Sequence, residues 1–272
     1  MGVMLRARGL NFAWPGGGRR LVDIDLEIGH GDVHCILGPN GSGKTTLLRC
    51  LLGGLTPASG SIAVDGVAIG GLSARLLARK VAVVPQASQS VFGHLVLDMV
   101  LMGRSALLPF MGTPAAADVA IAERALERVG IAHLAGRPFG AISGGEQQLC
   151  LIARALAQEA PLVVLDEPAA SLDLGNQIRI LEIIGTLADE GYGVLMTTHH
   201  PDHALRVGTR VLGLRDGRVF GTGRPDELLS APFLSGLYGA PVRVIRDRDG
   251  TLACIPALPG RSSESRPCHI AS

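Results

Sequence analysis

Aromatic side chains and long apolar runs are scarce in this sequence. Phe, Trp and Tyr together make up 3% of its 272 residues. Hydrophobic residues reach 47% and the mean hydropathy is +0.34, yet no apolar stretch approaches the ~18 to 20 residues of a membrane-spanning helix. The apolar stretch from Leu95 to Met102, for example, contains Asp98. We therefore expect that the chain does not itself span a membrane.

A secretory signal and a cysteine framework are also missing. Residues 1–8 contain two Arg but no apolar core before a small-residue cleavage site. The five cysteines are odd in number, widely spaced and without a Cys-x-x-Cys pair, which argues against disulfides and against a zinc site. We expect reduced thiols and a cytosolic location. With 25 basic and 24 acidic side chains, the net charge of +1 gives no basic field for nucleic acid, so no such partner is expected.

Apolar periodicity predicts an α/β protein. Residues 3–37 have the alternation of short strands, with a hairpin turn at 16–18, and a helix is expected from Lys44 to Leu52. Further strands are expected at 81–85, 162–166, 194–198 and 211–214. Strands that alternate with helices favour a mostly parallel sheet.

Residues 91–158 have a different pattern, which is helical throughout. Helices are expected at 115–129 and 144–158, separated by Pro- and Gly-marked loops, and no strand is expected. This pattern predicts an all-helical insertion. Residues 260–272, rich in Ser, Arg and Pro, are expected to be a disordered tail.

A Gly-rich motif of the form GxxxxGK[ST] spans residues 38–45, between the apolar strand 33–37 and a helix. Its backbone amides and the helix N-terminus can surround phosphates, Lys44 can reach the β- and γ-phosphates, and the Thr45 hydroxyl can ligate Mg²⁺. The residues expected to hold ATP are Gly38, Pro39, Asn40, Gly41, Ser42, Gly43, Lys44, Thr45 and Thr46.

Two further segments can serve a nucleotide. The apolar run 162–165 ends in Asp166 and Glu167, and downstream of the Gly-rich loop these carboxylates are expected to hold Mg²⁺ through water and to polarise the attacking water. Ser143 begins a helix with Gly144 and Gly145, which makes a second anion site. Because the first site already serves one nucleotide, the second is expected to serve the nucleotide of another copy.

In this order, residues 38–45, Gln86, 143–147, 166–167, 172–173 and His199 resemble the ATP-binding subunit of an ABC transporter. The resemblance covers residues 3–256 and implies a head-to-tail homodimer with two ATP molecules between its copies. It implies that Gln86 contacts Mg²⁺ or the lytic water, that His199 contacts the γ-phosphate and orients water with Glu167, and that Asp173 couples the two sites. The implied nucleotide contacts across the dimer are Ser143, Gly144, Gly145 and Glu146.

The implied fold is α/β, a P-loop NTPase core with an N-terminal antiparallel β-subdomain and an inserted all-helical subdomain. The expected division is a core at 1–90 and 159–256, a helical subdomain at 91–158 and a tail at 257–272. Trp14, the single tryptophan, stands where the family has an adenine-stacking aromatic residue. Three departures from the family pattern are Ile142, Glu146 and the segment 169–171, the last of which leaves the role of Ser171 open.

Segments outside the ATP site resemble importers of iron-siderophore, haem, vitamin B12 or molybdate type; they are 101–104, 198–204 and 242–247. The implied partners are an integral-membrane permease and, through it, a periplasmic or lipid-anchored substrate-binding protein, with this chain at the cytoplasmic face of the inner membrane. A groove at 88–104 is expected to receive the permease. Its apolar residues are Val91, Phe92, Leu95, Val96 and Leu97, which can equally belong to the core.

Alternatives remain for both the function and the histidines. The motor of an ABC exporter is one alternative, and a non-transport ABC ATPase is another, although 272 residues with one P-loop leave no room for the long coiled coils or second half of that class. His199 and His203 are spaced as metal ligands, but no Glu or Cys ligand lies beside them, which favours packing or surface roles. The sequence does not identify the transported ligand.

Overall fold

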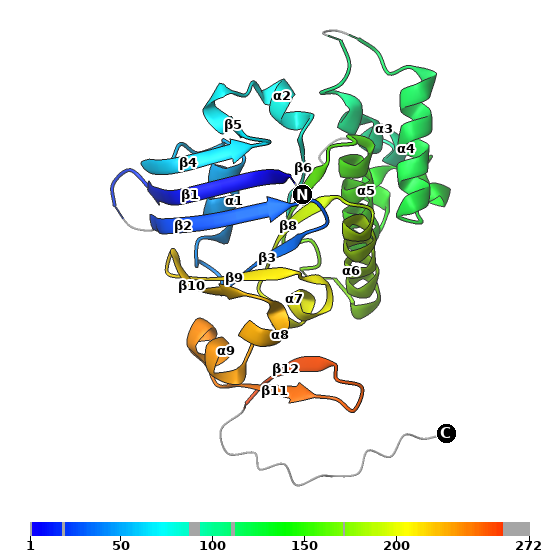
Figure 1. The fold of residues 1–272 in the computed structure, drawn as a ribbon. Helices are drawn as coiled ribbons and strands as arrows, with labels where there is room; N and C mark the ends of the chain where they lie inside the picture. The colour runs from blue at the N-terminus through cyan, green and yellow to red at the C-terminus, as the bar shows by residue number, and fades with distance from the viewer. Residues whose placement is uncertain (1, 18–19, 87–92, 110–111, 171, 258–272) are drawn as a thin grey trace, which may run out of the picture.

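A single ten-stranded sheet organises the molecule. The structure, a computed structural model, describes residues 2–17, 20–86, 93–109, 112–170 and 172–257 (Figure 1). The strand order is β5-β4-β1-β2-β10-β9-β3-β8-β7-β6, and β11 and β12 form a separate hairpin. None of the helices formed by these residues is long and apolar enough to cross a bilayer.

The strands are β1 (Val3–Ala13), β2 (Arg20–Gly29), β3 (Val33–Leu37), β4 (Ser59–Val64), β5 (Val67–Ala68), β6 (Val81–Val84), β7 (Leu162–Asp166), β8 (Gly193–Thr198), β9 (Arg210–Arg215), β10 (Arg218–Gly223), β11 (Val242–Arg246) and β12 (Leu252–Pro256). The helices are α1 (Lys44–Leu51), α2 (Ala74–Ala78), α3 (Val96–Leu101), α4 (Ala116–Arg128), α5 (Gly144–Ala157), α6 (Leu174–Asp189), α7 (Pro201–Val207), α8 (Pro225–Leu228) and α9 (Ala231–Tyr238). Where the sequence analysis gave bounds for a single helix or strand, the observed bounds agree with them within one or two residues.

The sheet is mixed, and its parallel part positions the loops that follow the strands. Strands β9, β3, β8, β7 and β6 run parallel to one another. In contrast, β9 pairs antiparallel with β10, and β1 pairs antiparallel with β2 and β4. In β3 every residue is buried. The carboxyl ends of β3, β7 and β8 therefore meet at one edge, where a ligand crevice is expected in an open α/β sheet.

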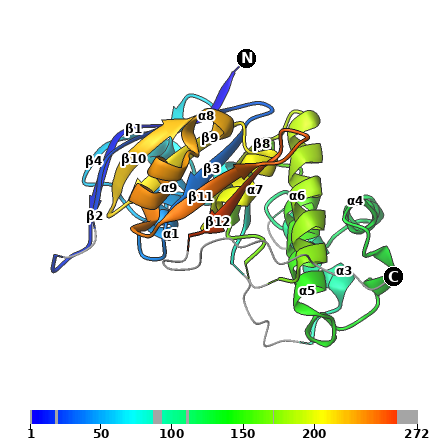
Figure 2. The ribbon, with the colours of Figure 1, turned by 90° about the horizontal axis from the view of Figure 1, so that it is seen from below.

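Two hydrophobic cores cover the two faces of the sheet. Because side chains alternate along a strand, Cys35 and Leu37 of β3 face the core that contains α3, α4, α5 and α6, while Ile36 faces the core shared by α1, β1 and β2. Figures 1 and 2 both show α3, α4 and α5 grouped on one side of the sheet. The fold therefore joins a helical group, a parallel sheet and an antiparallel β-layer.

A buried arginine ties the helical group together. Arg104, only 8% exposed, donates from Nε to Asp118 at 3.0 Å, and from a terminal nitrogen to Ala157 O at 2.8 Å and Glu159 at 2.6 Å. Burying a charge is costly unless it is paired and hydrogen-bonded. The three acceptors meet that requirement and fix the end of α3 against α4 and α5.

The structure departs from the sequence-based expectations at particular elements. Strand β10 was not predicted, because its glycines and half-exposed alternation give a weak strand signal, and with β9 it makes the sheet less parallel than expected. In the expected permease groove, Val96 is fully buried and belongs to the core, whereas Leu95 is 40% exposed. Val91, Phe92, Ser171 and residues 258–272 lie outside the described residues.

Candidate nucleotide-binding and hydrolysis site

The Gly-rich loop lies at the carboxyl end of β3 and leads directly into α1. A Cβ on Gly38 would stand 2.2 Å from the Leu214 carbonyl oxygen, so no larger residue fits there. Gly41 and Gly43 have φ angles of +82° and +111°, which only glycine adopts without strain. The spacing of the glycines is therefore explained by the backbone path.

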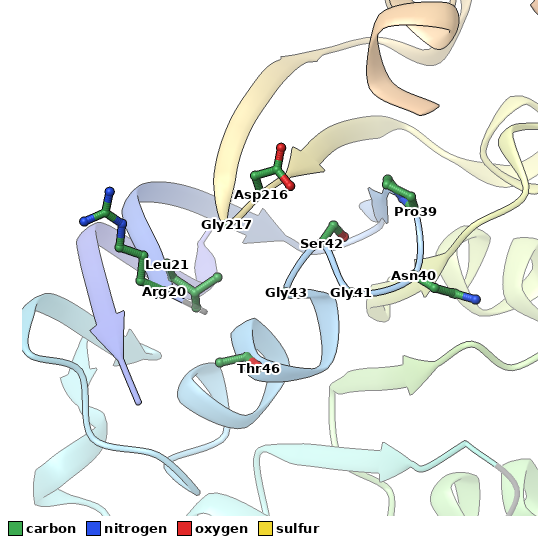
Figure 3. A pocket seen from close by; sticks show the side chains of 10 residues that line it. All are labelled: Arg20, Leu21, Pro39, Asn40, Gly41, Ser42, Gly43, Thr46, Asp216 and Gly217. Carbon is green, nitrogen blue, oxygen red and sulfur yellow. The ribbon is translucent and has the colours of Figure 1, made fainter. Parts of the chain in front are cut away.

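Two cavities flank this loop. The first has a volume of about 450 Å³, and Figure 3 shows how β2, the loop and the β9–β10 turn surround it. Its lining residues are Arg20, Leu21, Pro39, Asn40, Gly41, Ser42, Gly43, Thr46, Asp216 and Gly217. The second, of about 360 Å³, is lined by Asn40, Gly41, Gly43, Lys44, Thr45, Thr46, Gln86 and Glu167. All nine predicted phosphate-loop residues except Gly38 therefore line a cavity, and Gln86 joins Glu167 in the second.

Lys44 is held by the loop it belongs to. Its ammonium donates to Gly38 O at 2.9 Å and to Pro39 O at 3.2 Å. It also lies 3.2 Å from Glu167 Oε1, and the side chains of Lys44 and Glu167 are only 5% and 13% exposed. The ion pair supplies the counter-charge that a buried ammonium requires.

Asp166 is oriented by two hydroxyl groups. Thr45 Oγ1 donates to Asp166 Oδ2 at 3.2 Å, and Thr197 Oγ1 donates to Asp166 Oδ1 at 2.6 Å. The carboxylate and hydroxyl oxygens are the hard donors that Mg²⁺ prefers, and Mg²⁺ usually takes only one or two protein carboxylates. The residues present therefore fit this ion. Thr197 was not predicted from the sequence. It lies opposite Asp166 in the parallel pair β7–β8, and this register brings the two side chains together.

Glu167 has a backbone conformation that is unusual for its residue type. Its φ is +49°, in the left-handed region, which costs roughly 1–3 kcal/mol for a non-glycine residue and is concentrated at functional sites. Its amide donates to Thr197 Oγ1 at 2.9 Å, which holds this conformation. Its Oε2 lies 3.2 Å from Nδ1 of His199. The geometry is not that of a hydrogen bond, and this buried nitrogen has no hydrogen-bond partner among the described residues.

Three histidines follow β8 and pack on one another. The ring centroids of His199 and His200 are 4.1 Å apart, and those of His200 and His203 are 4.9 Å apart. Burial lowers the pKa of His200 and lowers that of His203 to about 4. Within the described ranges, no group of three His, Cys, Asp or Glu side chains is arranged to hold a metal ion.

Ser143 caps helix α5 reciprocally with Glu146. The Ser143 hydroxyl accepts a bond from the Glu146 amide at 3.3 Å, and the Glu146 carboxylate accepts one from the Ser143 amide at 2.7 Å. The hydrogen bonds that the Ser143 amide and hydroxyl donate to the Glu146 carboxylate lower the pKa of Glu146. Gly144 is exposed, and although residues 143–146 all lie within the described part of the chain, none of them lines either cavity.

Asp173 caps helix α6 close to the start of α5. Its carboxylate caps α6 by accepting from the Asn176 amide at 2.9 Å and from the Asn176 side chain at 2.7 Å, and these bonds lower its pKa. A Cβ on Gly145 would come within 2.4 Å of Asn176 Nδ2. Asn176, which sequence reasoning missed, therefore connects the predicted coupling residue with the start of α5.

Trp14 lies at the end of β1, beside the hairpin turn. It is 37% exposed and packs edge-on against Phe12, with ring centroids 5.3 Å apart. Trp14 does not line the first cavity. Its neighbour Ala13 pairs with Arg20, and Arg20 lines that cavity. The structure therefore places Trp14 near the loop without bringing it into the cavity.

Comparisons with known proteins agree with this geometry. The profile of the ABC transporter family matches residues 21–170. An uncharacterised ABC transporter ATP-binding protein of Haemophilus influenzae is 43% identical over 81% of this chain and 84% of its own length. A cobalamin import ATP-binding protein of Halobacterium salinarum is 39% identical over 91% of this chain, which spans 62% of that relative.

Two further comparisons extend the match. A hemin import ATP-binding protein of Nocardia farcinica is 38% identical over 89% of this chain and 85% of its own length. A solved chain from an inward-facing ABC transporter, assigned to the metal-chelate type, has a TM-score of 0.84 and 32% identity over 94% of this chain and 98% of that one. The chain belongs to the ABC transporter family and is an ATP-binding, ATP-hydrolysing protein of that class. The expected fold class and family resemblance are thereby confirmed.

Proposed function

We propose that this chain is the motor of a bacterial ABC importer and works as a head-to-tail dimer beside a membrane permease. The observation that carries the proposal is the convergence of Lys44, Asp166 and Glu167 at the edge of the sheet where β3 and β7 end. His199, which follows β8, approaches the Glu167 carboxylate. These groups can bind a triphosphate, balance its charge and activate a water molecule.

Each residue has a distinct role in hydrolysis. Lys44 and the loop amides hold the β- and γ-phosphates, and a γ-phosphate oxygen competes with Glu167 for the ammonium that lies 3.2 Å away. Once released, the carboxylate can accept a proton from the attacking water, while His199 contacts the γ-phosphate. Thr45 and Asp166, with Gln86 at the rim, would hold Mg²⁺, which neutralises developing phosphate charge when it is bound.

The second anion site supports a composite arrangement. Gly144, at the N-terminus of α5, is exposed, so this helix end is open to a ligand. Residues 143–146 nevertheless line neither cavity of their own chain. In a head-to-tail dimer, this helix end would close the site of the partner copy, and Asp173 would link the two sites through Asn176. Leu174, 71% exposed beside Asp173, has the exposure expected of a residue covered by a partner.

A mixture of two inactive variants tests this dimer. Lys44→Ala damages the phosphate loop, and Gly144→Asp puts a carboxylate where the partner's phosphate would approach. An added Cβ on Gly144 meets no atom within 4 Å, so the second variant should fold normally. Each variant alone should lack ATP turnover. After equal mixing and exchange, about a quarter of all sites should be intact, because mixed dimers retain one undamaged pair of loop and helix end.

Gly136→Asp is the matched control, since Gly136 is exposed and also meets no atom within 4 Å. It should keep wild-type turnover, and mixing it with Lys44→Ala should give only the turnover expected from its own share of the subunits. If Gly144→Asp and Lys44→Ala remain inactive after verified subunit exchange, the head-to-tail arrangement is wrong.

The relatives support the direction of transport and a class of cargo. The relatives include ATP-binding proteins of cobalamin and hemin import, and we propose that this chain powers uptake of an iron chelate, haem, cobalamin or an oxyanion. In a reconstituted complex with its permease, ATP turnover should rise when the cargo-loaded binding protein is added. An exporter would instead be favoured if ATP turnover is unchanged by the binding protein and rises when cargo is added from the cytoplasmic side.

Trp14 gives a test of the adenine position. If the indole stacks on adenine, Trp14→Ala should raise the KM for ATP by about tenfold and leave kcat comparatively intact, since stacking contributes roughly 1–3 kcal/mol per base and acts equally in the ground and transition states. As the only tryptophan, it also reports directly, so ATP should change its fluorescence saturably and inorganic triphosphate should not. Equal responses to ATP and triphosphate would place adenine elsewhere.

A further inference from the structure

The segment after β10 reaches back to the loop that carries His199. Helix α9 ends at Tyr238, whose hydroxyl donates a 2.8 Å hydrogen bond to the backbone carbonyl of His199, 39 residues earlier. Figures 1 and 2 show α9 beside the β11–β12 hairpin, and β12 of that hairpin lies against α7. Helix α9 therefore contacts the backbone of His199, a residue of the candidate site.

Helix α9 is fixed in place before it reaches this carbonyl. The Phe233 ring fits against Gly213 of β9 and Gly221 of β10, where an added Cβ would come within 2.8 Å of the ring. Leu234 and Leu237 of the same helix are fully buried. The tyrosine hydroxyl is therefore presented by a helix with little freedom to move.

The hairpin provides a second hold on the same segment. The amide of Cys254 in β12 donates to the Asp202 carboxylate at 2.8 Å, in the first turn of α7. Val244 and Cys254 pack on the core beneath. The segment from His199 to Asp202 is thus held at its start by α9 and three residues later by β12.

The His199 imidazole has little else to orient it. Its ring packs against His200, but no side-chain hydrogen bond within the described part of the chain fixes it, and its Nδ1 lies 3.2 Å from Glu167 Oε2 without hydrogen-bond geometry. The ring position relative to Glu167 is therefore determined mainly by the backbone of His199. That backbone is held through its carbonyl by Tyr238.

We propose that Tyr238 is a positioning residue for ATP hydrolysis, which holds the His199 backbone so that the imidazole stays aligned with Glu167 and the γ-phosphate. The inference rests on the proposed role of His199. Burial raises the pKa of the Tyr238 phenol, so its hydroxyl remains a proton donor throughout the physiological range. Small displacements of a catalytic group can cost large factors in rate, which is why one distant hydrogen bond can matter.

Tyr238→Phe removes only the hydroxyl, and Tyr192→Phe is the matched control. Tyr192, the other tyrosine in the chain, packs under Arg128, 5.6 Å from its ring centroid, and the ring contact survives the change to Phe. We expect Tyr238→Phe to lower kcat roughly five- to tenfold with little change in the KM for ATP. Tyr192→Phe should behave as wild type, and both variants should keep the wild-type Tm within a few degrees.

A double variant distinguishes positioning from general support of the fold. If Tyr238 acts through His199, adding Tyr238→Phe to His199→Ala should cause no further loss of kcat, because the group being positioned is already gone. Wild-type kcat in Tyr238→Phe, or a full additional loss in the double variant, would overturn the inference. Wild-type kcat in His199→Ala would instead overturn the proposed role of His199, so the two failures are distinguishable.

Discussion

Replacing Lys44 with Ala should abolish measurable ATP hydrolysis and weaken ATP binding. Phosphoryl transfer depends mainly on positioning and electrostatic stabilisation, and removing one preorganised donor from a transition state commonly costs about 100-fold or more in kcat. The Lys44 ammonium lies where the loop, β7 and the second cavity meet. Phosphate release by the purified protein or by the assembled transporter measures the effect.

Lys80 provides an unusually close control, because the chain has only two lysines. Lys80 pairs with Asp65 at 2.6 Å on a partly exposed surface far along the chain from the phosphate loop. Lys80→Ala should keep wild-type turnover, since exposed ion pairs contribute little. Lys44→Ala also removes the counter-charge of Glu167, so its Tm should be recorded beside its activity. A folded Lys44→Ala variant with wild-type turnover would refute the phosphate-loop assignment.

Much of the fold and the placement of many candidate site residues were predictable from sequence because local patterns specify them. Glycines at 38, 41 and 43 are required by close approach or positive φ, and the loop lies between a buried strand and a helix. The apolar run of β7 likewise predicted where Asp166 and Glu167 would emerge. In these places, the backbone conformation and the chemistry depend on the same few neighbouring residues.

The residues that were missed act across long sequence distances. Thr197 bonds Asp166 and the Glu167 amide only because β7 and β8 are adjacent and in register. Asn176 contacts Gly145 where two helix ends meet, and Tyr238 reaches His199 from a helix that ends 39 residues further along the chain. A Thr, an Asn or a Tyr carries no local signature of such a role, so tertiary structure was needed to identify them.

Replacing Glu167 with Gln should separate ATP binding from hydrolysis. The amide keeps the size of the side chain but cannot accept the proton of the attacking water, so turnover should fall by about 10²- to 10⁴-fold. Binding should persist, because Lys44, the loop amides and Asp166 are unchanged, and Lys44 no longer has a carboxylate competing with the γ-phosphate. Size-exclusion chromatography with and without Mg-ATP should therefore show a dimer that forms only with nucleotide.

Glu182→Gln is the control for a change of charge alone, since Glu182 is exposed on α6 and lines neither cavity beside the phosphate loop. It should hydrolyse ATP as the wild type does and should not form the trapped dimer. The Glu167 backbone is held in a left-handed conformation by the hydrogen bond from its amide to Thr197, and residues in such costly conformations are concentrated at functional sites. A Glu167→Gln variant that stays monomeric with Mg-ATP and still turns over would show that another group accepts the proton.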